Sequence, residues 1–118
     1  MGKVRMCIPT ISNAGLEDSV SNIFAKSPTF TFIDIEDKTI SKVIVEENTY
    51  REVKQGVGPV VMKSLQEREV DIIVAGEIGP GAKTLMEISG IQRVEVEPGL
   101  EVLKAIKFVL PNVMKMES

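Results

Sequence analysis

The stretch DIIVAGEIGPGAKTLMEISG, residues 71–90, decides how this chain is expected to fold. Its first six residues, 71–76, form a short apolar run typical of a buried strand. From Pro80 onward the composition is that of a helix, and Gly90 is placed to cap the end of that helix. Three glycines mark the junction between strand and helix: Gly76, Gly79 and Gly81. A strand that passes into a helix in this way predicts a right-handed crossover between parallel strands.

The same alternation of strands and helices continues on both sides of this stretch. Periodicity predicts further strands over 4–8, 29–36, 40–47 and 91–97, a helical turn near 20–25, and helices over 59–70 and 98–110. Residues 37–39 read as a hairpin turn, which makes one strand antiparallel. We therefore expect an α/β fold with a mixed five-stranded sheet and helices on both faces. It forms one domain over 1–111, with the last helix stopped at Pro111 and a loose tail over 112–118.

Composition excludes several classes of function. The 118 residues carry a net charge of −3, with scattered basic residues, so no broad nucleic-acid surface is expected. Histidine is absent, which removes the commonest general base and the commonest transition-metal ligand. Cys7 is the only cysteine, so a reducing compartment is the natural interpretation. No apolar run is long enough to span a bilayer, and we expect a cytoplasmic protein without a membrane partner.

The glycines indicate where a ligand could bind. In open sheets ligands gather outside the carboxyl ends of the parallel strands, where the segments 10–24, 55–59 and 76–82 should meet. Two of these segments place glycines at a helix start, where free N–H groups and the helix dipole favour an anion. The candidate residues are Gly56, Gly58, Gly76, Gly79 and Gly81. The alternative is that these glycines only permit tight turns and close packing, because neither nucleotide-binding glycine motif is present.

Two side chains could complete such a site. Cys7 lies near the end of the first strand, where a thiolate could ligate a soft metal, although a buried structural thiol is the commoner fate of a lone cysteine. Lys26 could clamp an anion from the first loop, or it could simply face water while Phe24 and Phe30 anchor the segment. Glu77 is the one carboxylate within a glycine loop, and a single carboxylate makes no acid–base pair.

Two longer stretches carry a resemblance to a known family. The segment with the pattern SxxFxxxPxF, residues 21–30, and the segment AGxxGPGA, residues 75–82, together resemble the dinitrogenase iron–molybdenum cofactor-binding family, the NifX-like proteins also found as a C-terminal module of NifB-type proteins. The resemblance covers roughly residues 3 to 110. It implies a ribonuclease H-like, three-layer α/β/α sandwich, which agrees with the order of elements above.

The resemblance also implies a function. Known members of the family bind or carry anionic iron–sulfur clusters, including cofactor precursors, and are not enzymes. We accordingly expect a carrier for an iron–sulfur or molybdenum–iron–sulfur cluster, a cluster donor or acceptor protein as partner, and a monomer or homodimer. Where many members have histidine, this chain has Ile23 and Gln55, and Lys26 replaces an arginine. Both histidine positions are therefore without a metal-ligating side chain.

Two other functions stay open at this point. A module that keeps the scaffold without its ligand, used for interaction or regulation, is consistent with the missing histidines. A metal-dependent nuclease, suggested by the ribonuclease H-like scaffold, would need several carboxylates converging on a divalent cation, and the first strand offers none.

Overall fold

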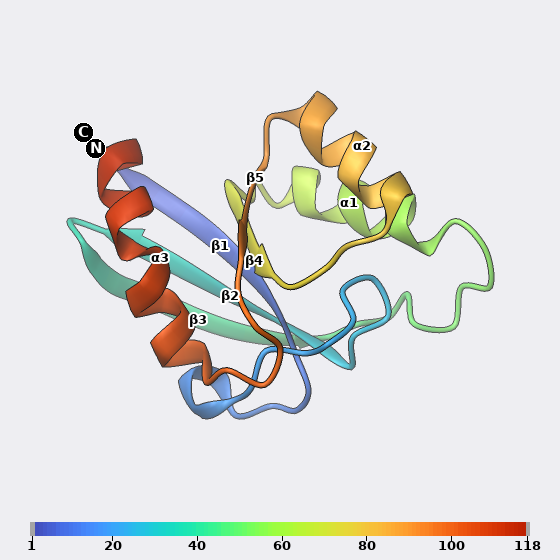
Figure 1. The fold of residues 1–118 in the computed structure, drawn as a ribbon, viewed down its shortest axis with the longest axis horizontal. Coiled ribbons are helices and arrows are strands. Elements are labelled where there is room, and N and C mark those ends of the chain that lie inside the picture. Colours follow the sequence, from blue (N-terminus) through green and yellow to red (C-terminus); the bar gives the residue numbers. More distant parts are fainter. Residues whose placement is uncertain (1, 118) are drawn as a thin grey trace.

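A computed structural model describes the backbone of residues 2–117 and the side chains of residues 2–111. Figure 1 shows a sheet with helices on both of its faces. The elements in chain order are β1 (Lys3–Thr10), the short 3₁₀ helix η1 (Gly15–Glu17), β2 (Thr29–Glu36), β3 (Thr39–Glu47), α1 (Val57–Glu67), β4 (Ile72–Ala75), α2 (Pro80–Ser89), β5 (Gln92–Glu95) and α3 (Val102–Glu117).

The five strands form one mixed sheet in the order β3-β2-β1-β4-β5. β2 pairs antiparallel with both β1 and β3, whereas β4 pairs parallel with β1 and with β5. Helical crossovers join the parallel strands, because a parallel neighbour can be reached only by a long connection. The prediction of an α/β sandwich with a mixed five-stranded sheet is confirmed.

The hairpin between β2 and β3 forms where local sequence predicts it. Asp37 and Lys38 both adopt positive φ, 52° and 66°. Two consecutive left-handed residues are the geometry of a tight two-residue hairpin turn, and aspartate tolerates that region better than most residues. Near this turn the register between the strands shifts at Asp34 and Ile35, which marks a β-bulge.

Two apolar clusters lie on opposite faces of the sheet. Residues that alternate along a strand point to opposite faces, so Ile33 and Ile35 of β2 join the cluster beneath α3, whereas Phe30 and Phe32 join the cluster beneath α1 and α2. The central strand β4 is buried along its whole length, as expected for a parallel strand covered on both sides.

Three details differ from the sequence-based expectations. β1 continues through Pro9 to Thr10, because its pairing with β4 involves only Met6 and Cys7 and the missing N–H breaks no bond to that neighbour. The helical turn expected near 20–25 is absent, and η1 lies earlier in the loop. The backbone of α3 continues past Pro111 to Glu117, so the predicted helix end was wrong. The division into a domain over 1–111 and a tail over 112–118 stays a prediction.

Candidate functional site

The first turns of α1 and α2 lie side by side. A Cβ atom placed on Gly58 would lie 3.5 Å from both the Cβ and the backbone nitrogen of Ala82, and one placed on Gly81 would lie 3.8 Å from Cδ of Pro59. Figure 1 shows the two helices packed against each other at one side of the sheet. A Cβ at either position would make only ordinary van der Waals contacts, so the two helix starts lie against each other and their N-terminal ends form one rim.

This rim presents backbone N–H groups that the helices do not use. The helical ladders begin where Val60 N–H donates to the Gly56 carbonyl and Lys83 N–H donates to the Gly79 carbonyl. Each helix also has a proline in its first turn, which contributes no N–H. The donors left outside the ladders belong to Val57 and Gly58 in α1 and to Gly81 and Ala82 in α2. Both N-cap residues are glycines, and neither helix has a side-chain cap.

The N-terminus of α3 is arranged differently. Val102 N–H donates to the backbone carbonyl of Asp18 at 2.8 Å. Asp18 is itself buried, and its carboxylate accepts hydrogen bonds from the backbone N–H groups of Ser12, Ala14 and Ser19. The start of α3 is thus closed by the loop after β1, whereas the starts of α1 and α2 have no such closure.

The two N-cap glycines of the rim, Gly56 and Gly79, differ in whether the backbone conformation requires a glycine. Gly56 has φ of 71°, a left-handed conformation in which a side chain would be strained, so the turn into α1 requires it. Gly79 is different, because its φ is −68° and a Cβ there would meet nothing within 4 Å. No steric demand explains the glycine at that position.

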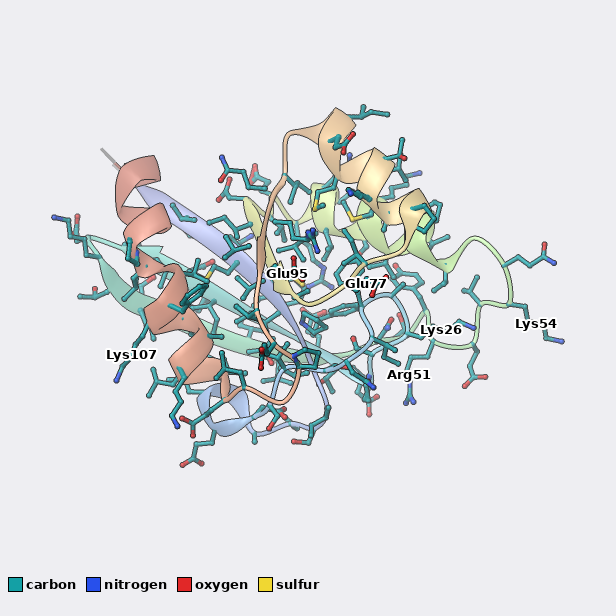
Figure 2. The ribbon with its side chains drawn as sticks, in the orientation of Figure 1. Lys26, Arg51, Lys54, Glu77, Glu95 and Lys107 are labelled. Carbon is teal, nitrogen blue, oxygen red and sulfur yellow. The ribbon has the colours of Figure 1, made fainter. Side chains whose placement is uncertain are left out.

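Gly76 lies apart from the rim. A Cβ on it would lie 3.3 Å from Cγ of Pro98, and its carbonyl accepts a hydrogen bond from Nη1 of Arg93 at 3.0 Å. It lines an open groove of about 580 Å³ together with the carboxylates Glu77, Glu95 and Glu97 and the apolar residues Val96, Pro98, Leu100 and Phe108. Figure 2 labels Glu77 and Glu95, two of the carboxylates that line this groove. Three carboxylates suit an anion poorly, and the close contact with Pro98 accounts for a glycine at this position. That Gly76 binds a cofactor stays a prediction.

Cationic side chains occupy two loops on the side of the molecule where α1 starts. Lys26 precedes β2, and Arg51 and Lys54 lie between β3 and α1, as Figure 2 shows. All three are exposed, and within the described part of the chain none of them makes an ion pair. Their loops also carry the carboxylate Glu52, which lies between Arg51 and Lys54 in the sequence.

Asn48 joins these two loops. Its Nδ2 donates to the carbonyl oxygens of Ala25, at 2.8 Å, and Ser27, at 3.0 Å, while its Oδ1 accepts from Tyr50 N–H at 3.0 Å. The Asn48 N–H also donates to the Pro28 carbonyl. Asn48 is buried, so these bonds replace water and hold the loop that carries Lys26 against the loop that carries Arg51.

Cys7 lies in the core. It has no exposed surface and belongs to the apolar cluster beneath α1 and α2. Burial raises the pKa of its thiol far above the ordinary value, because an apolar surrounding disfavours the thiolate. Ligation of a metal by Cys7 would require that core to open, and it stays a prediction. Within the described residues, no group of three or more His, Cys, Asp or Glu side chains could hold a metal ion.

The site therefore combines residues that the sequence suggested with others that it did not. Gly58 and Gly81 lie where the starts of α1 and α2 touch, and Gly56 and Gly79 are the N-caps of these helices. That these glycines bind a cofactor stays a prediction. Sequence reasoning missed Asn48, Arg51 and Lys54. For Arg51 and Lys54 a signal existed, since they are basic residues just before a glycine-rich helix start. Nothing in the sequence signals the burial of Asn48 at the end of a largely exposed strand.

Known proteins share this fold. A structure described as a putative NifB protein from Thermotoga is 29% identical, with a TM-score of 0.74 over 92% of this chain and 88% of that one. The apo form of the orange protein from Desulfovibrio gigas is 20% identical, with a TM-score of 0.81 over 92% and 88%. A putative dinitrogenase from Methanocaldococcus jannaschii is 18% identical, with a TM-score of 0.66 over 96% and 93%. The last two, at such low identity, show similarity of fold alone.

Sequence comparison gives a family. No curated protein matches the chain. None of the helices described, over residues 2–117, combines the length and apolar character needed to cross a bilayer. The sequence profile of the family described as "Dinitrogenase iron-molybdenum cofactor" matches residues 4–112, nearly the whole chain. The chain therefore belongs to the dinitrogenase iron–molybdenum cofactor family.

Proposed function

We propose that this protein binds an anionic iron–sulfur or molybdenum–iron–sulfur cluster, or a precursor of one, as cargo at the rim formed by α1 and α2, and that it carries this cargo without reacting it. The observation that carries the proposal is the contact between Gly58 and Ala82, which brings two uncapped helix N-termini together. Family membership supports the class of cargo.

Hydrogen bonds and charge would hold the cargo. The N–H groups of Val57, Gly58 and Gly81 can donate to sulfide or oxo groups, whereas Ala82 is buried against Gly58. Each helix N-terminus contributes about 0.3–1 kcal/mol toward an anion when exposed. Lys26 and Arg51 add charge from the loops that Asn48 joins. Because the described residues offer no set of metal ligands, the metals would keep the ligands that they bring with them.

Binding of this kind suits a carrier. A cluster held by hydrogen bonds and electrostatic attraction can leave without the breaking of a metal–protein bond, so transfer to an acceptor protein is not slowed by ligand exchange. A carrier of this kind needs no catalytic group, so the proposal includes a role without catalysis. The partner would be a protein that donates or accepts the cluster.

Anaerobic reconstitution tests the proposal. The full chain is incubated with iron and sulfide, or with molybdate and sulfide, and desalted, and its metal content and visible absorption are measured. We expect stoichiometric metal in the unchanged protein and strong loss in a Lys26→Glu, Arg51→Glu double variant. The matched control is Lys107→Glu, which changes an exposed lysine of α3 (Figure 2). Failure of the unchanged protein to retain metal, or equal retention in all variants, contradicts the proposal.

The same assay separates two modes of binding. If the rim holds the cargo by hydrogen bonds, a Cys7→Ser variant keeps its absorption. If Cys7 is a ligand, that variant loses it, and the core must open during loading.

The ligand-free interaction or regulatory module is the second candidate. The buried thiol of Cys7 and the absence of a metal-ligand group among residues 2–111 favour it. Elemental analysis of protein purified without oxygen distinguishes the two functions, because only a carrier retains metal. The nuclease alternative gains no support, since the Asp34 carboxylate is paired with Arg5 and Lys3.

A further inference from the structure

β3 is an edge strand with one side open. The sheet ends at β3, which spans nine residues and pairs only with β2 among the described strands. Its central residues are apolar and accessible, with Val43 exposed to 37% and Ile44 to 39%. A long edge of this kind offers a row of backbone donors and acceptors, and proteins normally cover or charge such edges.

The regular part of this edge starts after the bulge. The shift between Asp34 and Ile35 leaves Ser41 outside the register, whereas the pairing from Lys42 to Glu47 is continuous. Alternation places Lys42, Ile44 and Glu46 on the face of the sheet that α1 covers, and one pocket on that face is lined by all three. The two valines of this segment, 43 and 45, lie on the opposite face.

We propose that β3 pairs antiparallel with β3 of a second copy of this chain, around a two-fold axis at Ile44. In this register Lys42 of each copy lies opposite Glu46 of the other, Val43 lies opposite Val45, and Ile44 lies opposite itself. The pairing therefore matches charge with charge and apolar surface with apolar surface over residues 42–46, and Glu47 of each copy falls opposite Ser41 of the other, at the bulge.

Neighbouring registers do not match. When the axis moves to Val43, Lys42 faces Ile44 of the partner copy and Glu46 faces Ile40. When the second copy instead slips by one residue along the strand, Val43 faces Glu46 rather than Val45. Each alternative places a charge against an apolar side chain, so the sequence of β3 specifies one self-complementary register.

Glu46 is held in place for this contact. Its carboxylate pairs with Arg68, and the Arg68 guanidinium lies over the ring of Phe32 at 4.8 Å from the centroid. Both charged side chains stay partly accessible, at 38% for Glu46 and 40% for Arg68. A carboxylate can accept further hydrogen bonds beyond a bidentate arginine, so Lys42 of the second copy would extend this pair into a network.

The expected dimer is weak and concentration-dependent. Pairing of one strand from each copy buries less surface than a standard interface, so association is expected in the range of ~10 µM to ~1 mM. The dimer would contain one continuous ten-stranded sheet, in which the edge of β3 is covered in both copies. The rim of α1 and α2 contributes no residue to this contact.

Sedimentation of charge variants tests the register. We expect the unchanged protein to dimerise with rising concentration, and Lys42→Glu and Glu46→Lys each to weaken dimerisation by about tenfold or more, because each places like charges opposite one another. An equimolar mixture of the two variants restores the dimer, since every facing pair is again opposite in sign. Lys63→Glu, on the exposed surface of α1, is the matched control and leaves dimerisation unchanged.

Cross-linking provides a second test that does not depend on the charges. Ile44→Cys places two cysteines opposite each other at the axis and is expected to form a disulfide-linked dimer on mild oxidation. Thr39→Cys, on the same strand but outside the paired segment, is not. A protein that stays monomeric at ~1 mM, variants that dimerise like the unchanged chain, or equal cross-linking at both positions would overturn the proposal.

Discussion

Charged side chains at the two ends of the layer formed by α1 and α2 differ in whether they form ion pairs. At one end, Nε of Arg5 donates to the Asp34 carboxylate at 2.8 Å, Lys3 lies 3.4 Å from the same carboxylate, and Arg68 pairs with Glu46. At the other end, within the described residues, Lys26 and Arg51 make no ion pair and the helix N-termini have no side-chain caps. Paired charges stabilise the fold, whereas under the proposed function Lys26 and Arg51 are available to a ligand.

The largest effect is expected at the paired end. Asp34→Ala removes both hydrogen bonds from Arg5 and leaves a partly buried guanidinium without its partner. We expect a loss of roughly 2–3 kcal/mol in the free energy of unfolding, measured by urea denaturation. Metal retention after reconstitution should not change. A variant that loses metal but not stability would break the distinction between the two ends.

The Asp34 carboxylate also makes the free energy of unfolding depend on pH. Hydrogen bonding from Arg5 holds the pKa of Asp34 below its ordinary value. Since the folded pKa is lower than the unfolded pKa, the stabilisation is fully present above about pH 4 and is lost as the pH falls further. Denaturation curves from pH 7 down to pH 3 measure this dependence, and an Asp34→Asn variant should show a shallower decline in the acid range.

An intermediate effect is expected at the junction of the two cationic loops. Asn48→Ala removes three side-chain hydrogen bonds from a buried position and should lower the free energy of unfolding by about 2 kcal/mol. It should also reduce metal retention, because the loops that carry Lys26 and Arg51 would no longer be joined by the Asn48 side chain. The control is Asn13→Ala, an exposed asparagine in the loop after β1. Unchanged retention in Asn48→Ala would show that the loops do not contribute to binding.

The smallest effect on stability is expected at Gly79. This residue has the extended conformation of an N-cap and open space around it, so serine fits without strain. Its hydroxyl would accept an N–H of the first turn of α2, raise the free energy of unfolding by about 0.3 kcal/mol, and weaken metal retention by occupying that donor. Gly79→Ala lacks the hydroxyl and separates its effect from that of added bulk. If both variants retain metal like the unchanged protein, the free N–H groups are not the binding determinant.

Much of the fold could be predicted because its signals are local. The alternation of apolar residues in β2 and β3 defines both strands, and the left-handed turn at Asp37 and Lys38 needs only its neighbours. The glycine loop between β4 and α2 could be predicted from local sequence in the same way. The end of α3 was not, because the helix tolerates Pro111 at the cost of one N–H donor, which local propensity alone does not reveal.

The sequence by itself determined the class of fold, the glycine-rich helix starts and, by the lack of histidine, the absence of the commonest metal ligand. Tertiary structure alone decided that Gly58 packs directly on Ala82, that Asn48 joins two loops, and which of the two fates open to Cys7 holds, since its thiol lies in the core. The physical reason is the separation along the chain between the residues that interact. Backbone conformation and burial pattern depend on neighbours along the chain, whereas contact between distant segments depends on how the sheet arranges its crossovers.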